Sequence, residues 1–286
     1  MKKFIYPIVA IATFLAMQAV AGIAAVGVLY LLRGEQMNEC LGSGEAVGSM
    51  EGLTSPGLLA FATVMSGVLT VGVISLLRMI DWSKVFRVKD IEWKWGMTSI
   101  AAAIFGIFGI NVMDEMLDLP NLMEDTFLDL SESWAGVLCL GVIGPVLEEL
   151  IFREGVEGYM LRNGVRPWVA IVSSALMFGI VHLNPAQVPF AFAVGIILGF
   201  IYCRTGNIVI TSILHIANNS AAVWQMQTLG EKAKDFSMVA ELGGTLPAVF
   251  IACSCLAVCI VWIVSSSRLL QERGKSMWGK KQTGQP

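Results

Sequence analysis

Charged residues are scarce in this chain of 286 residues: they make up 14% of the sequence, while 56% of the residues are hydrophobic. The mean hydropathy of +0.71 implies more apolar surface than a core surrounded by water can bury. This composition excludes a water-soluble globular protein and predicts an integral membrane protein. No basic patch exists beyond short loop clusters, so membrane lipid is an expected partner and nucleic acid is not.

Histidine and several familiar catalytic motifs are also scarce or absent. The chain has only two histidines, His182 and His215. It contains no HExxH zinc motif, no GxSxG nucleophile motif and no glycine-rich nucleotide-binding loop. The sequence therefore gives no support to a zinc protease of the HExxH type or to a serine hydrolase.

Long apolar runs, in contrast, recur along the whole chain. A helix needs about 20 apolar residues to cross the hydrocarbon core of a membrane. The sequence predicts an all-α fold, a polytopic bundle of about eight transmembrane helices. The predicted spans are 5–32, 57–77, 97–113, 135–160, 168–183, 187–203, 207–226 and 244–266.

The connecting segments differ in charge and so predict the orientation of the chain. Fifteen of the 19 Lys and Arg residues fall in the two termini and in alternate loops, which by the positive-inside rule places both termini in the cytoplasm. On the opposite side, residues 114–132 carry seven carboxylates and no Lys or Arg. We expect this acidic segment to be a solvated loop, with a lid or an amphipathic interfacial helix as the alternative.

Polar residues within the predicted spans are the candidates for function, because ionisable groups in a membrane are costly. The fourth span contains Glu148, Glu149 and Arg153. On an α-helix Glu149 and Arg153 are four residues apart and can pair, which leaves Glu148 pointing elsewhere and free for chemistry.

Two further polar strings hold both histidines. Phe178 and His182 lie in the fifth span, and His215 and Asn219 lie one helical turn apart in the seventh. Counted inward from the basic loops at about 1.5 Å per residue, Glu148, His182, His215 and Asn219 agree in depth to within about 10 Å. We expect the four side chains to converge near the middle of the membrane.

Such a group of side chains can hydrolyse a peptide bond without a covalent intermediate. Glu148 can act as the general base toward a water molecule that His182 orients, and His215 and Asn219 can stabilise the oxyanion. We expect the site to open toward the cytoplasm. Glu148, His182 and His215 could instead bind Zn²⁺, but no metal is expected.

The three strings resemble the motifs of the CPBP family of intramembrane proteases, also called the Abi or CAAX-protease family, which includes the eukaryotic Ras-converting CAAX endopeptidase. The resemblance covers residues 135–226 and follows the pattern EExxxR, FxxxH and HxxxN. Glu154 departs from the pattern, since a small residue usually follows the arginine. The resemblance implies an enzyme of this type with Glu148 and His182 as water activators, His215 and Asn219 as oxyanion ligands, and Glu149, Arg153 and Phe178 as supporting residues.

The chain accordingly divides into N-terminal helices (1–134), a catalytic core (135–226), and a last helix with a basic tail (227–286). The expected substrate is a membrane-embedded or lipidated peptide or protein, and the expected location is a bacterial cytoplasmic membrane. The alternatives are a non-catalytic peptide-binding or bacteriocin-immunity protein of the same fold, a proton-coupled transporter, and a haem protein ligated by both histidines. The oligomeric state is not predicted.

Overall fold

The computed structural model describes residues 2–42, 55–86, 92–206 and 208–278, which form helices and no strand. The predicted all-α fold class is therefore confirmed. Six helical stretches are long and apolar enough to cross a membrane, so the chain is a polytopic integral membrane protein. They are Lys2–Leu31, Pro56–Leu76, Trp93–Glu115, Trp134–Arg162, Val188–Thr205 and Thr245–Ser266.

All eight predicted runs are helical, but two of them are not long and apolar enough to qualify as spans. The helix α9 (Pro167–Ile180) has 14 residues, and at about 1.5 Å per residue it is shorter than the hydrocarbon core of about 30 Å. The helix α11 (Val209–Leu229) has 21 residues, but polar side chains such as His215, Asn218 and Asn219 interrupt its apolar sequence. These two helices carry both histidines.

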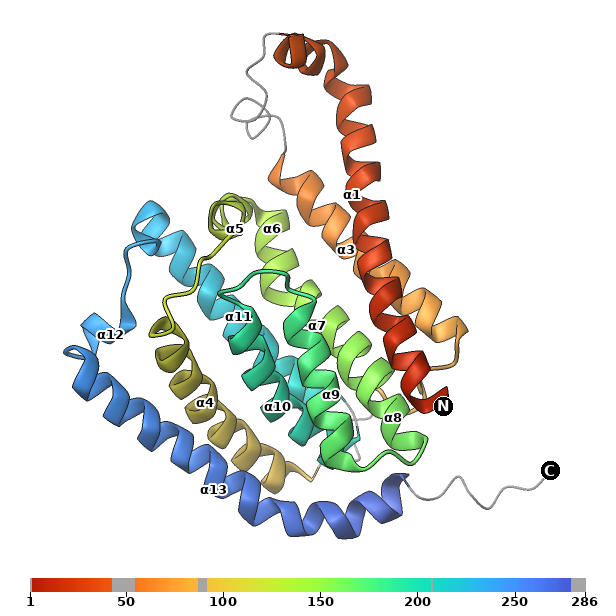
Figure 1. The fold of residues 1–286 in the computed structure, drawn as a ribbon, viewed down its shortest axis with the longest axis vertical. Helices are drawn as coiled ribbons and strands as arrows, with labels where there is room; N and C mark the ends of the chain where they lie inside the picture. The colour runs from red at the N-terminus through yellow and green to blue at the C-terminus, as the bar shows by residue number, and fades with distance from the viewer. Residues whose placement is uncertain (1, 43–54, 87–91, 207, 279–286) are drawn as a thin grey trace.

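The helices form three groups that lie side by side (Figure 1). The helices α1 (Lys2–Gly42) and α3 (Pro56–Leu76) pack together on one side. The helices α4 (Trp93–Glu115) and α13 (Thr245–Trp278) pack together on the other. Between them lie α9, α10 (Val188–Thr205), α11 and the fourth predicted span, and α9 packs against α10. The polar strings are thus in the middle of the bundle.

The fourth predicted span is one continuous helical stretch whose winding changes along its length. It consists of α6 (Trp134–Leu138), the π-helix η2 (Cys139–Ile143), α7 (Gly144–Glu148), the π-helix η3 (Glu149–Gly158) and α8 (Tyr159–Arg162). The sequence interpretation assumed a regular α-helix here. Pro145 explains part of the difference, because it has no N–H to continue the helical hydrogen bonds. Glu148 and Glu149 lie at the junction of α7 and η3.

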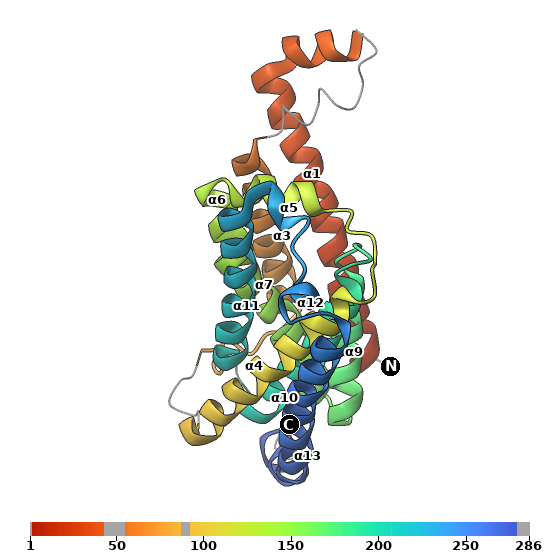
Figure 2. The ribbon, with the colours of Figure 1, turned by 90° about the vertical axis from the view of Figure 1, so that its left-hand side faces the viewer.

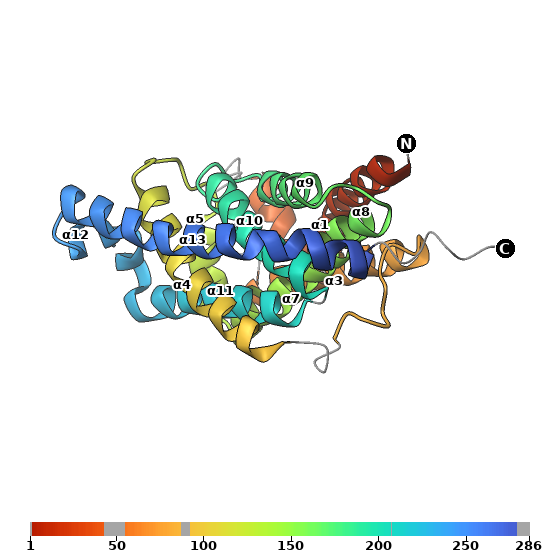
Figure 3. The ribbon, with the colours of Figure 1, turned by 90° about the horizontal axis from the view of Figure 1, so that it is seen from below.

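The two ends of the bundle differ in charge. Figure 1 shows that α1 and α4 begin, and that α8 and α10 end, at the same end of the bundle. We call this the basic end, because it includes Lys2, Lys94, Arg162 and Arg204. In the side view of Figure 2, α5 and α6 lie at the opposite, acidic end. Viewed from below, α13 runs across the molecule in front of the other helices (Figure 3).

The acidic segment contains a short helix rather than only a loop. The helix α5 (Glu124–Ser131) buries Leu128 and Leu130, and Leu130 packs with Ala60 of α3 and Cys139 of η2. The expected solvated loop is therefore wrong for Glu124–Ser131. These residues form a helix, as the alternative interpretation of an amphipathic helix predicted. The apolar side chains interleaved with the carboxylates provide the buried face that stabilises it.

Candidate active site

The Glu-Glu-Arg string forms a buried ion pair at the start of η3. Arg153 Nε lies 3.3 Å from Glu149 Oε2, and both side chains are fully buried. Arg153 Nη1 also lies 3.4 Å from Ser174 Oγ, which in turn donates a hydrogen bond to the Phe152 carbonyl. The predicted pairing of Glu149 with Arg153 is confirmed, and Ser174 is a supporting residue that the sequence interpretation did not identify.

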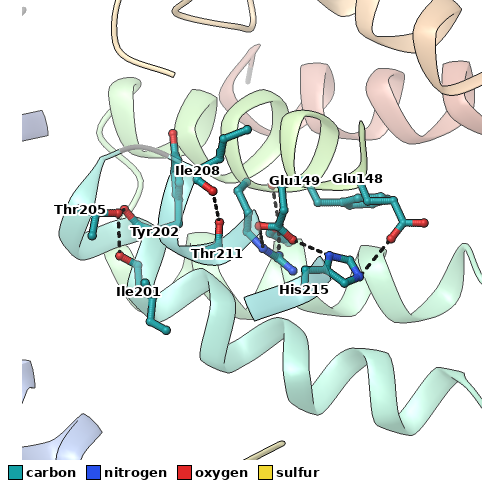
Figure 4. A network of polar contacts seen from close by, with 11 residues as sticks. Glu148, Glu149, Ile201, Tyr202, Thr205, Ile208, Thr211 and His215 are labelled. Carbon is teal, nitrogen blue, oxygen red and sulfur yellow. Dashed lines mark hydrogen bonds and ion pairs between the residues drawn. The ribbon is translucent and has the colours of Figure 1, made fainter. Parts of the chain in front are cut away.

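His215 lies between the two carboxylates (Figure 4). Its Nδ1 is 3.1 Å from Glu149 Oε1, and its Nε2 is 3.5 Å from Glu148 Oε2. The imidazole is nearly buried at 6% exposed, whereas the Glu148 side chain is 26% exposed. The buried Glu149 fixes the orientation of the ring, and the ring contacts the accessible carboxylate. The sequence predicted that these groups converge but did not predict that His215 bridges the glutamates.

Phe178 links the two histidines. Its ring packs edge-to-face on His182, with centroids 4.9 Å apart, and on His215, with centroids 5.7 Å apart. The Arg153 guanidinium lies 5.0 Å from the centre of the same ring. His182 Nδ1 is 2.7 Å from the Phe178 carbonyl, which can only accept, so Nδ1 carries the hydrogen. In a neutral ring, His182 Nε2 is then the basic nitrogen.

Asn219 contacts the backbone that precedes Glu148. Its Nδ2 donates to the Leu140 carbonyl at 3.3 Å, and the neighbouring Ser220 Oγ donates to the Gly141 carbonyl at 3.2 Å. In the i→i+5 pattern of η2, the donor to Leu140 would be the nitrogen of Pro145, which has no hydrogen. The polar side chains of α11 therefore satisfy carbonyls in this part of the π-helix.

We expect Asn219→Ala to lower the stability of the protein by about 1–3 kcal/mol, because the Leu140 carbonyl would be left without this donor. The measurement is thermal unfolding in detergent without substrate. Thr228→Ala is the control, since Thr228 is an exposed residue of the same helix and its hydroxyl donates only to the Trp224 carbonyl within α11 in the described structure. An Asn219→Ala protein that is as stable as the control would show that the backbone contact has no structural role.

The ligand set suggested for a metal does not assemble in this structure. Among the described residues, no group of three or more His, Cys, Asp and Glu side chains is arranged to hold a metal ion. Both nitrogens of His215 face carboxylates, and Nδ1 of His182 faces a carbonyl. The donors Glu148, His182 and His215 therefore do not fit a zinc site in this arrangement.

Glu154, which departs from the family pattern, belongs to a different network. Its carboxylate accepts a hydrogen bond from Tyr202 at 2.5 Å, pairs with Arg162 at 2.5 Å and accepts from the Asp81 backbone N–H at 2.9 Å. These partners come from α10, α8 and the segment after α3. Glu154 therefore points toward the basic end of the bundle and joins three elements there.

Comparisons with known proteins agree with the three motifs. Residues 130–221 match the model of the family described as type II CAAX prenyl endopeptidase Rce1-like. The chain is 30% identical over 87 residues to YdiL of Bacillus subtilis, by its name a candidate membrane peptidase. It is 28% identical over 92 residues to the membrane-embedded CAAX protease MroQ of Staphylococcus aureus. The resemblance to this family is confirmed for the matched segment.

The similarity covers only part of each protein. The two alignments include 30% of this chain, and they span 35% of YdiL and 37% of MroQ, about a third of each relative. No solved structure matches the chain significantly. The family model covers the segment that contains the glutamate pair, both histidines and Asn219.

Proposed function

We propose that this chain, whose residues 130–221 match the CAAX-protease family, is an intramembrane endopeptidase that hydrolyses peptide bonds of membrane-associated proteins or peptides. One observation carries the proposal: a partly exposed carboxylate, Glu148, contacts His215, and the buried Glu149 orients that imidazole. A base held by an oriented partner is the arrangement that proton transfer in hydrolysis requires.

In the proposed reaction, Glu148 accepts a proton from a water molecule, and His182 Nε2 accepts a hydrogen bond from the same water and orients it. The water oxygen forms a bond to the carbonyl carbon, and the electron pair moves to the carbonyl oxygen. Once Glu148 is protonated it no longer pairs with His215 Nε2, which can then donate a hydrogen bond to this oxyanion. Asn219 is the second oxyanion ligand, because its carboxamide nitrogen has a hydrogen beyond the one donated to Leu140. Glu148 then gives the proton to the amine as the carbon–nitrogen bond breaks.

We propose that no metal takes part in this reaction. Glu148 and His182 together supply the base and the orientation of the water, which are the roles that a metal would otherwise fill. Elemental analysis of the purified active protein tests the point. We expect less than about 0.1 equivalent of zinc and unchanged activity after chelation, whereas stoichiometric zinc that is required for activity would contradict the proposal.

The proposed location is a bacterial cytoplasmic membrane. Both curated relatives come from bacteria, and the six apolar helices support an integral membrane protein. The proposed substrates are membrane-embedded or lipidated peptides and proteins, because a base inside an apolar bundle can act only on a segment that enters the membrane.

The experiment that tests the function compares membrane and secreted peptides from cells that produce the wild type or Glu148→Gln. The substitution keeps the size of the side chain but removes its ability to accept a proton. We expect cleavage products in the wild type and their loss in the variant.

Glu132→Gln is the matched control, because Glu132 is an exposed residue of the acidic segment and lies outside the site. We expect it to retain the cleavage products. Identical peptide profiles for the wild type and Glu148→Gln would contradict proteolysis and favour a non-catalytic peptide-binding protein.

A further inference from the structure

We infer that Asn184 is a positioning residue for His182, because its side chain bonds the turn that carries this histidine to the acidic segment. The inference rests on the proposed function, in which His182 Nε2 orients the attacking water. It follows from the hydrogen bonds of a fully buried carboxamide two residues beyond the histidine.

His182 lies just outside a regular helix. The helix α9 ends at Ile180, and α10 begins at Val188, so His182 belongs to the turn between them. Its backbone N–H donates to the Gly179 carbonyl at 3.2 Å, a bond of the i→i+3 kind rather than of an α-helix. Because the ring is bonded through Nδ1 to the Phe178 carbonyl, the position of Nε2 depends on the course of this turn as well as on α9.

The residue after His182 has an unfavourable backbone conformation. Leu183 has a φ of +52°, in the left-handed region that a leucine rarely adopts. The leucine side chain is 66% exposed, so its own packing does little to stabilise this conformation. A conformation of this kind persists only where the surrounding structure over-determines it. The stabilising contacts must therefore come from other residues of the turn.

Asn184 makes such contacts on two sides. Its side chain accepts from the Leu122 backbone N–H at 3.0 Å and donates to Asn121 Oδ1 at 2.8 Å. Its carbonyl accepts from the N–H groups of Gln187 and Val188 at 2.9 Å and 3.1 Å, at the start of α10. One residue thus joins the turn, the acidic segment and α10.

The acidic segment can serve as the fixed side of this contact, because its later part is packed into the bundle. In α5, Leu128 is buried, and Gln227 of α11 donates to the Ser131 carbonyl at 3.0 Å. Asn121 and Leu122 are themselves exposed. The hydrogen bonds to the buried carboxamide, rather than burial of residues 121 and 122, therefore join this part of the segment to the turn.

Backbone N–H groups determine which way both carboxamides point. The Leu122 N–H can only donate, so it faces Asn184 Oδ1, and Asn184 Nδ2 is left to donate to Asn121. Asn121 Oδ1 also accepts from the Met123 N–H at 3.3 Å. Position 121 therefore needs only an acceptor, whereas position 184 needs an acceptor and a donor. A change from asparagine to aspartate is expected to have opposite effects at the two positions.

The kinetic test compares these substitutions in the full chain. We expect Asn184→Asp to lower kcat by about 10–100-fold and to leave KM within about twofold, because a displaced imidazole no longer orients the water. Asn121→Asp keeps the acceptor and should leave kcat within about twofold. Asn121→Ala removes the acceptor at an exposed position, without burying a charge, and should lower kcat by about tenfold. Equal kcat values for the wild type and Asn121→Ala would overturn the inference.

A spectroscopic test needs no cleavage, because the chain has only two histidines, His182 and His215. Protein labelled with ¹³C at the imidazole Cε1 gives one NMR signal for each ring, and a His182→Gln variant assigns them. We expect Asn121→Ala to shift or split the His182 signal and leave the other unchanged, and Asn121→Asp to restore it. Asn163→Ala is the matched control and should alter neither signal, since Asn163 is exposed and donates to the Tyr159 carbonyl at the basic end.

An unchanged His182 signal in Asn121→Ala, or equal shifts of both histidine signals, would overturn the inference. The result is separate from the fate of the proposed function. If the His182 signal moves as expected while Glu148→Gln changes no peptide profile, the positioning of the imidazole stands and the protease assignment fails. If Glu148→Gln abolishes cleavage while the His182 signal does not move, the function stands and the inference fails.

Discussion

Replacing His215 with alanine is expected to lower kcat/KM for peptide hydrolysis by about 10²–10⁴-fold, the usual contribution of a positioned acid or base. In the described structure, His215 contacts both glutamates of the pair: Nδ1 faces Glu149, and Nε2 faces Glu148. Its loss removes the partner of the base and the proposed oxyanion donor at the same time. The measurement is the rate of cleavage of a membrane peptide by protein purified in detergent.

Thr228→Ala is the control for this change, because Thr228 is an exposed residue of α11 outside the site, and its hydroxyl donates to the Trp224 carbonyl of the same helix. We expect the control to keep its rate to within about threefold, a barrier change of less than about 1 kcal/mol. A rate for His215→Ala within tenfold of the wild type would contradict a direct role in the reaction. Unfolding temperatures of both variants distinguish a chemical defect from a loss of structure.

Replacing Arg153 with leucine is expected to lower the free energy of unfolding by about 3–5 kcal/mol, the cost of leaving one member of a buried ion pair alone. Arg153 and its partner Glu149 are both fully buried, so no water can replace the lost guanidinium. Glu157, one turn further along η3, is also fully buried, and its oxygens have no hydrogen-bond partner among the described residues. The measurement is unfolding in detergent followed by tryptophan fluorescence.

Two further variants define the origin of this effect. Arg166→Leu removes an exposed arginine at the basic end and should change stability by no more than about 0.5 kcal/mol. The double variant with leucine at both 149 and 153 should recover most of the lost stability, because neither charge remains buried alone. It should remain inactive, since Glu149 no longer orients His215. A double variant less stable than Arg153→Leu would contradict the ion-pair explanation.

The structure also explains why some predictions from the sequence were correct and others were not. The Glu149 and Arg153 pair was predictable because it depends on positions four residues apart in one helix, and it persists in the π-helical winding. A helix in the acidic segment was only the alternative to a solvated loop, because the packing of α5 depends on Ala60 and Cys139, which lie outside that segment. Local patterns therefore predicted local pairs and the approach of the motifs to one another, but not the individual contacts between distant elements.

The roles of individual polar residues also depend on tertiary contacts that the local sequence does not show. Glu154 was an unexplained departure from the family pattern, and its partners Tyr202, Arg162 and Asp81 lie on three other elements. Asn219 was predicted only as an oxyanion ligand, a role that remains a proposal. Its bond to the Leu140 carbonyl depends on how α11 packs against a π-helix that contains a proline.

The sequence by itself determined that this is a polytopic helical membrane protein with three linked polar strings, because scarce charge, apolar runs and motif spacing are properties of the chain alone. Only the tertiary structure decided that His215 bridges Glu148 and Glu149 and that Glu154 faces the basic end. These features depend on how helices far apart in the sequence pack together.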